Sequence, residues 1–185
     1  MSFDGGRRAY KLVGGLFIAA LVAVGASLVV KIALVQLGPA PPGAGEPAPD
    51  FQAPRLDGGG TVQLSALRGQ VVLLDFFSPS CVGCVGATPK LNRLYERYRA
   101  EGFTIVSMSQ VEESEAELIA FVERRQVRYP VVVDVGGKVT DAYGIYATPT
   151  VVLLDADGEI RAVHRGNVTE TRLQTEIEAL LRPKA

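Results

Sequence analysis

The sequence predicts an α/β fold in which a central mixed β-sheet is flanked by helices. From residue 50 onward, short apolar runs typical of buried strands alternate with longer segments whose apolar residues recur at helical spacing. Near the end, two strand patterns surround a tight Asp157-Gly158 turn, the pattern of a β-hairpin. The hairpin adds an antiparallel part to the sheet. The 185 residues suffice for one such domain and an appendage.

The predicted elements follow one another along the chain. The expected strands are Thr61–Leu64, Val71–Phe77, Phe103–Ser109, Val131–Asp134, Thr150–Asp155 and Glu159–His164. The expected helices are Cys84–Ala100, Glu112–Gln126, Val139–Tyr143 and Thr169–Leu181. The second strand reads VVLLDFF, a continuous apolar run typical of a strand buried on both faces. The second helix has acids early and arginines late, which suits its dipole.

A long apolar run near the N-terminus predicts a transmembrane anchor over residues 12–36. No charged residue lies between Leu12 and Val30, and a helix of about 20 apolar residues spans the hydrocarbon core of a bilayer. The alternative is a cleaved signal peptide, whose apolar region would be shorter, about 7–15 residues. The length of the run favours a retained anchor. Both interpretations predict an exported domain.

The charges around this run predict its orientation. Arg7, Arg8 and Lys11 precede it, whereas Lys31 alone follows. The positive-inside rule then puts residues 1–11 in the cytoplasm and all that follows the helix outside the membrane.

A spacer and one domain are expected after the anchor. Residues 37–49 are dominated by Pro, Gly and Ala, a composition that predicts a spacer without a core of its own. The domain is therefore expected over residues 50–185. The net charge of the whole chain, −1, gives no reason to expect nucleic acid as a partner.

The only two cysteines, Cys81 and Cys84, predict redox chemistry. Two residues separate them, so a disulfide between them closes a very short loop and adds little stability. They lie between a buried strand and a long helix, and a helix N-terminus stabilises a thiolate. A zinc site would need four ligands, and His164 is the only histidine. We therefore expect neither a metal nor a cofactor.

Two further features mark candidate site residues. Asp75 lies inside the VVLLDFF run, where burial of an unpartnered carboxylate raises its pKa. It is either a proton acceptor near the inner cysteine or a strand-end residue turned to solvent. Thr148 and Pro149 open a strongly apolar strand, a position where proline is also common for purely structural reasons.

Four segments together resemble the thioredoxin superfamily, and most closely its TlpA/ResA-like branch of membrane-tethered bacterial thiol–disulfide oxidoreductases, relatives of the AhpC/TSA redoxins. They are APDFQAPRLDGG, LSALRGQVVLLDFFSPSCVGC, TPKLNRLYERY and YGIYATPTVVLLDADGEI. The resemblance covers roughly the last three quarters of the chain. It implies a thioredoxin-like fold and a redox-active disulfide.

The resemblance also implies roles for individual residues. Cys81 corresponds to the attacking cysteine and Cys84 to the resolving one. Pro149 corresponds to a cis-proline that faces the disulfide, and Thr148 to the residue whose backbone pairs with substrate. Asp75, six residues before the first cysteine, corresponds to the buried acid of thioredoxins.

Three positions depart from the family pattern, while Pro89 matches the usual proline of the active-site helix. Ser80 stands where the family usually has Trp, Gly83 where it has Pro, and Val82 where Glu or Gly is frequent. These departures predict that the site lacks an aromatic contact surface and has a less rigid loop. They bear on substrate and reduction potential rather than on the type of reaction.

The resemblance implies partners as well. Protein thiols and disulfides are the expected substrates, with apocytochrome cysteines in cytochrome c maturation as one case. Reduction of such substrates would require a membrane thiol donor of electrons.

Two other functions remain open at this stage. A peroxiredoxin-like peroxidase shares the APDF and GQVVLLDFF segments, but Ser78-Pro79-Ser80 replaces its threonine-and-proline pattern before the cysteine. A tethered binding module without catalysis would not need Cys81.

Overall fold

The computed structural model describes residues 25, 27, 41–110 and 114–182. The expected cytoplasmic residues 1–11 lie outside the described residues, and so does the expected anchor over residues 12–36 except Gly25 and Ser27. Within the described residues, no helix combines the length and apolar character needed to cross a membrane. The chain from Pro41 onward forms a compact unit.

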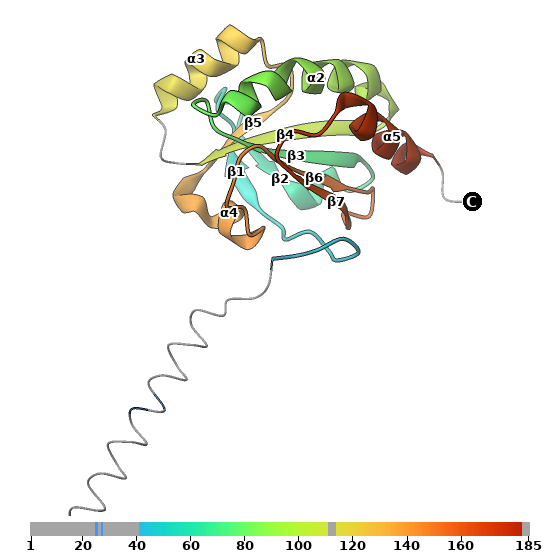
Figure 1. Ribbon diagram of the computed structural model, residues 1–185, viewed down its shortest axis with the longest axis horizontal. Coiled ribbons are helices and arrows are strands. Elements are labelled where there is room, and N and C mark those ends of the chain that lie inside the picture. Colours follow the sequence, from blue (N-terminus) through green and yellow to red (C-terminus); the bar gives the residue numbers. More distant parts are fainter. Residues whose placement is uncertain (1–24, 26, 28–40, 111–113, 183–185) are drawn as a thin grey trace, which may run out of the picture. The chain divides into compact units, whose positions relative to one another are not determined.

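A five-stranded mixed sheet forms the centre of this unit, with the strand order β5-β4-β3-β6-β7 (Figure 1). The strands are β3 (Val71–Phe77), β4 (Phe103–Gln110), β5 (Val131–Asp134), β6 (Thr150–Leu154) and β7 (Ile160–Arg165). Strands β3, β4 and β5 run parallel, whereas β6 is antiparallel to both β3 and β7. The predicted mixed α/β sheet is thus confirmed.

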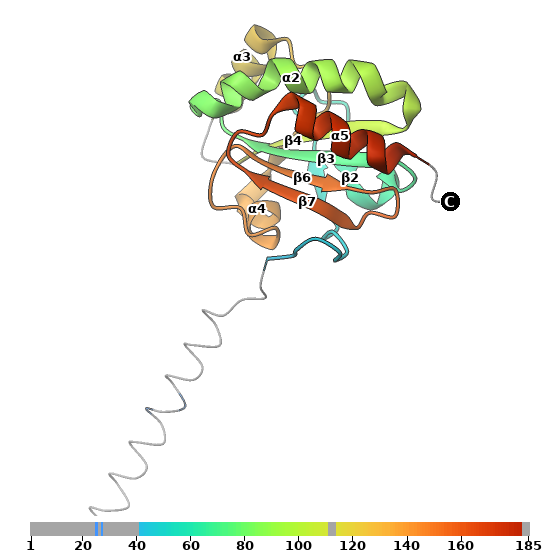
Figure 2. The same ribbon diagram turned by 45° about the vertical axis from the view of Figure 1, so that its right-hand side comes forward.

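Helices cover both faces of the sheet. They are α2 (Val82–Tyr98), α3 (Glu115–Arg125), α4 (Lys138–Ala142) and α5 (Glu170–Leu181). Short 3-10 turns occupy Leu64–Leu67, Arg99–Glu101 and Val135–Gly137. Helices α2, α3 and α5 lie on one side of the sheet and α4 on the other (Figures 1 and 2). The layers agree with the two main apolar clusters, one packed under α2 and α5 and the other against α4.

Strand β3 is buried along its whole length, and its side chains alternate between the two layers. Val71 and Leu73 pack under α2 and α5, whereas Val72, Leu74 and Phe76 pack in the layer of α4. The same alternation turns Asp75 toward α2. The sheet therefore brings this carboxyl group to the side that carries the cysteines.

Part of the expected spacer belongs to the domain. The Gly45 N–H donates to the Ile160 carbonyl (2.7 Å), the Ala48 N–H to Gly158 (3.0 Å), and the Ile160 N–H to Glu46 (2.9 Å). Ala48 is buried. The compact unit therefore begins before residue 50. The composition of the segment did not indicate this, because pairing through backbone groups needs no special side chains.

A small antiparallel sheet follows this segment. Its strands are β1 (Gln52–Pro54), which the sequence analysis missed, and β2 (Thr61–Gln63). Three residues are too short for a recognisable alternation of apolar and polar side chains.

All four predicted helix starts differ from the observed ones, by one residue at α4 and α5 and by more at α2 and α3. Helix α2 begins at Val82 rather than Cys84, because Cys81 has extended backbone angles and caps the helix with its sulfur. Helix α3 begins at Glu115 rather than Glu112, after a capping box formed by Ser114 and Glu117. Residues 111–113 lie outside the described part.

Candidate active site

The two cysteines occupy the first turn of α2, directly after the buried strand β3. Cys81 is the N-cap residue, and its Sγ accepts a hydrogen bond from the Cys84 N–H (3.2 Å). The Cys81 carbonyl also accepts from the N–H groups of Cys84 (3.0 Å) and Val85 (3.1 Å). Both side chains are free thiols. The arrangement describes a reduced pair at the positive end of a helix.

The two thiols differ in exposure. Cys81 is partly exposed, whereas Cys84 is only 2 % exposed. Cys84 packs in an apolar cluster with Phe77, Leu118 and Phe121. A substrate can therefore reach Cys81 but not Cys84.

The surroundings move the two thiol pKa values in opposite directions. Partial burial alone would raise the pKa of Cys81, but hydrogen bonds from Cys84, Thr148 and the Gly83 N–H outweigh it and lower that pKa below the ordinary range. Deeper burial raises the pKa of Cys84 to about 12, and its hydrogen bond to Cys81 adds to the effect. The outer sulfur is thus the better thiolate and the inner one stays protonated.

Thr148 and Pro149 lie against the redox pair, and the peptide bond between them is cis. The side chain of Thr148 contributes to lowering the pKa of Cys81. A Cβ added to Gly83 would lie 3.1 Å from Pro149 Cδ, so the proline ring packs directly on the Gly83 backbone. The Pro149 carbonyl in turn accepts from the Gly166 N–H (2.8 Å).

Sequence reasoning missed Asn167, which lies at the same contact. Its Nδ2 would be 3.3 Å from a Cβ at Gly83. The loop between β7 and α5 brings this side chain to the site, and no local pattern in the sequence could show it. Gly83 is thus confined by two neighbours. This confinement gives a structural reason for a residue without a side chain at this position.

Asp75 is buried, with 4 % exposure, and has one hydrogen-bond partner. Ser107 Oγ donates to its Oδ2 (2.6 Å), whereas Oδ1 is buried without a partner among the described residues. Burial raises the pKa of Asp75 to about 6, against smaller lowering effects of Ser107 and the charge of Lys90. The alternative of a strand-end residue turned to solvent is therefore wrong.

Two hydroxyl groups near Asp75 were also absent from the sequence analysis. Ser107 lies directly opposite Asp75 in the β3–β4 register, and Thr88 Oγ1 donates to the Cys84 carbonyl (3.1 Å). The Ser107 pairing could have been inferred from the parallel strands once their register was known. Thr88, four residues after Cys84, is one helical turn further along the same face of α2.

Comparison with known proteins assigns this arrangement to a family. The model of the AhpC/TSA family matches residues 44–163. The chain belongs to the AhpC/TSA family. It is 36 % identical over 142 residues to the thiol–disulfide oxidoreductase ResA of Halalkalibacterium halodurans, covering 77 % of this chain and 79 % of that protein. It is 34 % identical over 133 residues to ResA of Oceanobacillus iheyensis, covering 70 % and 69 %. The chain is a thiol–disulfide oxidoreductase.

Solved structures agree with this assignment. A crystal structure from Chlorobium tepidum, provisionally named thiol:disulfide interchange protein DsbE, has a TM-score of 0.72 and 29 % identity, covering 76 % of this chain and 99 % of that one. A solution structure from Neisseria meningitidis, provisionally named a thioredoxin, has a TM-score of 0.67 and 31 % identity, covering 72 % and 88 %. The expected thioredoxin-like fold is therefore confirmed.

The surface of this oxidoreductase near the redox pair carries exposed apolar side chains. Val82 is 86 % exposed beside Cys81, and Tyr146 is 80 % exposed on the loop that leads to Thr148. The Arg165 guanidinium lies over the Tyr146 ring, 5.3 Å from its centre. Ser80 is not aromatic, but an exposed aromatic ring, that of Tyr146, stands two residues before Thr148 in the sequence.

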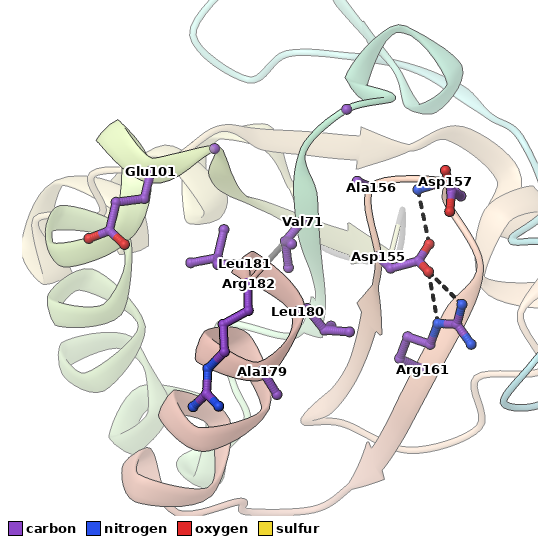
Figure 3. A pocket seen from close by; sticks show the side chains of 12 residues that line it. Val71, Glu101, Asp155, Ala156, Asp157, Arg161, Ala179, Leu180, Leu181 and Arg182 are labelled. Atoms are coloured by element: carbon purple, nitrogen blue, oxygen red, sulfur yellow. Dashed lines mark hydrogen bonds and ion pairs between the residues drawn. The ribbon is translucent and has the colours of Figure 1, made fainter. Parts of the chain in front are cut away.

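A cavity of about 660 Å³ lies away from this surface (Figure 3). Val71, at the opposite end of β3 from the cysteines, lines it together with the C-terminal end of α5. Its Arg161 and Asp155 pair with each other, with an Arg161 Nη2–Asp155 Oδ2 distance of 2.6 Å. Neither cysteine lines this cavity, so the cysteine pair lies at a different part of the surface.

Two glycines of α2 provide a matched test of the contact with Pro149. Nothing lies within 4 Å of a Cβ at Gly86, so Gly86→Ala should stabilise the protein by about 0.5–1 kcal/mol. In Gly83→Ala the new methyl group must displace Pro149 or Asn167. We therefore expect no such increase in stability, and a slower exchange with a protein disulfide. Denaturant unfolding and insulin reduction measure the two effects. Equal behaviour of the two variants would contradict the contact.

The raised pKa of Asp75 predicts a pH-dependent stability. The ordinary pKa of Asp is about 3.9, so the folded state holds this proton more tightly than the unfolded state does. The contribution of Asp75 is thus most favourable below about pH 4, and it falls by about 3 kcal/mol as the pH rises through about 6. Asp75→Asn cannot ionise and should escape this loss. The free energy of unfolding of the unmodified protein and of Asp75→Asn, measured from pH 4 to 7.5, tests this prediction. If the two free energies change with pH in parallel, the prediction is wrong.

Proposed function

We propose that this chain exchanges disulfides with protein substrates through Cys81 and Cys84, with Asp75 as the proton acceptor. The observation that carries the proposal is the contrast between the two thiols. Cys81 is accessible and has a lowered pKa, while Cys84 is buried, protonated and hydrogen-bonded to it. One sulfur is suited to attack a substrate and the other to attack only Cys81.

The reaction begins with the Cys81 thiolate. It attacks one sulfur of the substrate disulfide, and the other substrate sulfur leaves as a thiolate that takes a proton from water. A mixed disulfide between Cys81 and the substrate results. The geometry at the helix N-terminus favours this step, because the thiolate accepts the Cys84 N–H bond.

The second step uses Cys84 and Asp75. The Cys84 thiol gives its proton to the Asp75 carboxylate, which is ionised at neutral pH because its pKa is about 6. The Cys84 sulfur then attacks Cys81 Sγ, the mixed disulfide breaks, and the substrate leaves as a thiolate. The substrate has gained two electrons, and the pair Cys81–Cys84 is oxidised. The same steps in reverse oxidise a dithiol.

The residues around Cys81 are suited to an extended polypeptide. Thr148 and Pro149 border the redox pair. The Thr148 backbone can pair with a substrate strand, whereas Pro149 has no N–H and its carbonyl accepts from the Gly166 N–H. Val82 and Tyr146 provide apolar contact area on either side. Such a surface, without a deep pocket at the cysteines, favours a protein over a small molecule.

The proposed location is the outer side of the bacterial cytoplasmic membrane. The apolar run and its flanking cations support residues 12–36 as a single-pass anchor, with residues 1–11 inside and the redox domain outside. The likeness to ResA and DsbE proteins supports apocytochrome cysteines as the first substrates to test, with a membrane thiol donor as the source of electrons.

The assignment of roles predicts a trapped intermediate. Cys84→Ser removes the resolving sulfur, so the mixed disulfide formed by Cys81 should accumulate with protein substrates and disappear on reduction. Non-reducing electrophoresis and mass spectrometry of membranes that carry the full chain measure it.

Matched variants complete this experiment. Cys81→Ser and the double variant should trap nothing and should lose activity. Accumulation of conjugates by Cys81→Ser instead of Cys84→Ser would contradict the roles. Full function of Cys81→Ser would favour the binding module, and rapid peroxide consumption with a thiol donor would favour the peroxidase.

A further inference from the structure

A small cavity lies beneath the redox helix, beside the free oxygen of Asp75. Its volume is about 10 Å³, close to the minimum that one water molecule requires. Three hydroxyl-bearing side chains line it with Asp75: Thr88, Ser107 and Tyr129. Asp75 Oδ1 is buried and has no hydrogen-bond partner within residues 41–110 and 114–182, so the cavity is lined by a residue with an unsatisfied polar atom.

Tyr129 forms part of the wall between this cavity and the protein surface. It is 6 % exposed and lines both the inner cavity and an outer groove of about 580 Å³ between α3 and Arg55–Asp57. Val127 and Val131 also line both spaces, but neither has a polar side chain. Tyr129 thus provides the polar group shared by the cavity and the groove.

The side chain of Tyr129 lies beside two other hydroxyl groups of the cavity. Ser107 and Thr88 line the same space, and each lowers the pKa of Tyr129 against the larger effect of burial. Ser107 donates to Asp75, and Thr88 donates to the Cys84 carbonyl. Burial and the nearby Asp75 charge raise the pKa of Tyr129, so its hydroxyl remains protonated and can both donate and accept.

We propose that Tyr129 is a positioning residue for the proton that Asp75 receives from Cys84. It provides a path, here called the rear path, by which this proton moves from Asp75 to water in the outer groove. The proton passes from Asp75 Oδ1 to a water molecule in the small cavity, and this water gives a proton to the Tyr129 oxygen while the hydroxyl proton of Tyr129 passes to water in the groove. Asp75 is then again a carboxylate, and Tyr129 is again a neutral phenol. No electron moves in this step. The inference rests on the proposed function, in which Asp75 accepts that proton.

The position of the groove explains why such a path is useful. In the mixed disulfide the substrate covers Cys81, Thr148 and Pro149. None of these residues lines the groove, whose walls come from α3, from Tyr95 of α2, and from residues 55–57 and 127–131. The path therefore stays open while the substrate is bound, and the proton can leave before the substrate does.

Tyr129→Phe tests this path, and Tyr95→Phe is its matched control. Phe keeps the ring and the wall but removes the hydroxyl. Tyr95 packs edge-on against Tyr129, with ring centres 6.0 Å apart, and lines the groove but not the cavity. Thr88→Val is a second variant that removes another hydroxyl group from the wall of the cavity.

A symmetrical nitro-aromatic disulfide separates the two chemical steps. Its first coloured thiolate appears when Cys81 attacks, and its second appears when Cys84 resolves the mixed disulfide. Stopped-flow absorbance from pH 5 to 9 follows both. We expect Tyr129→Phe to slow the second release about tenfold and to shift its pH midpoint, with the first release unchanged. Thr88→Val should act in the same direction, and Tyr95→Phe should match the unmodified protein.

Each outcome decides a different point. A Tyr129→Phe profile that equals that of Tyr95→Phe, or a slowing of both releases by the same factor, overturns the rear path. Asp75→Asn serves as the reference for the proposed function. If its second release is as fast as that of the unmodified protein, then Asp75 is not the acceptor and the proposed function fails in that part. If the second release is slow in Asp75→Asn but normal in Tyr129→Phe, the proposed role of Tyr129 is wrong while Asp75 remains the proton acceptor.

Discussion

The hydrogen bond from the Cys84 N–H to Cys81 Sγ is the interaction on which the rest of the site depends. It exists because the chain leaves the fully buried strand β3 and turns into α2 with Cys81 as the N-cap. The same turn places Cys84 on the buried face of α2, where its side chain packs against apolar side chains. A single local geometry thus separates an accessible thiol with a lowered pKa from a buried one with a raised pKa.

The site keeps this geometry at a cost in stability. A buried carboxyl group and a buried thiol replace apolar side chains at the centre of the layer under α2, and one oxygen of Asp75 has no partner among the described residues. Under the proposed function, the buried carboxyl group that lowers stability is the one that accepts the proton of Cys84. The Ser107 hydrogen bond and the charge of Lys90 offset part of the cost, because both favour the ionised carboxylate. Such compromises are common where a fold carries chemistry.

Much of the fold and the centre of the site could be predicted from the sequence. The VVLLDFF run, the Asp157-Gly158 turn and the cysteine pair are local patterns. They sufficed to predict the mixed sheet and to place the two cysteines between a buried strand and a helix. Asn167, Ser107 and Tyr129 could not be found in this way, because each comes from a distant segment that only the tertiary structure brings to α2. The docking of residues 43–48 was missed for a related reason: it depends on backbone hydrogen bonds, to which composition gives no guide.

The pH dependence of alkylation at each thiol tests the contrast between Cys81 and Cys84 most directly. Mass spectrometry of the reduced chain after short pulses of iodoacetamide can follow both sites separately from pH 5 to 10. An ordinary cysteine has a pKa of about 8.5. The structure predicts that Cys81 is alkylated with a midpoint below this value, whereas Cys84 stays unmodified throughout the range. Equal midpoints for the two thiols, or earlier modification of Cys84, would contradict the account.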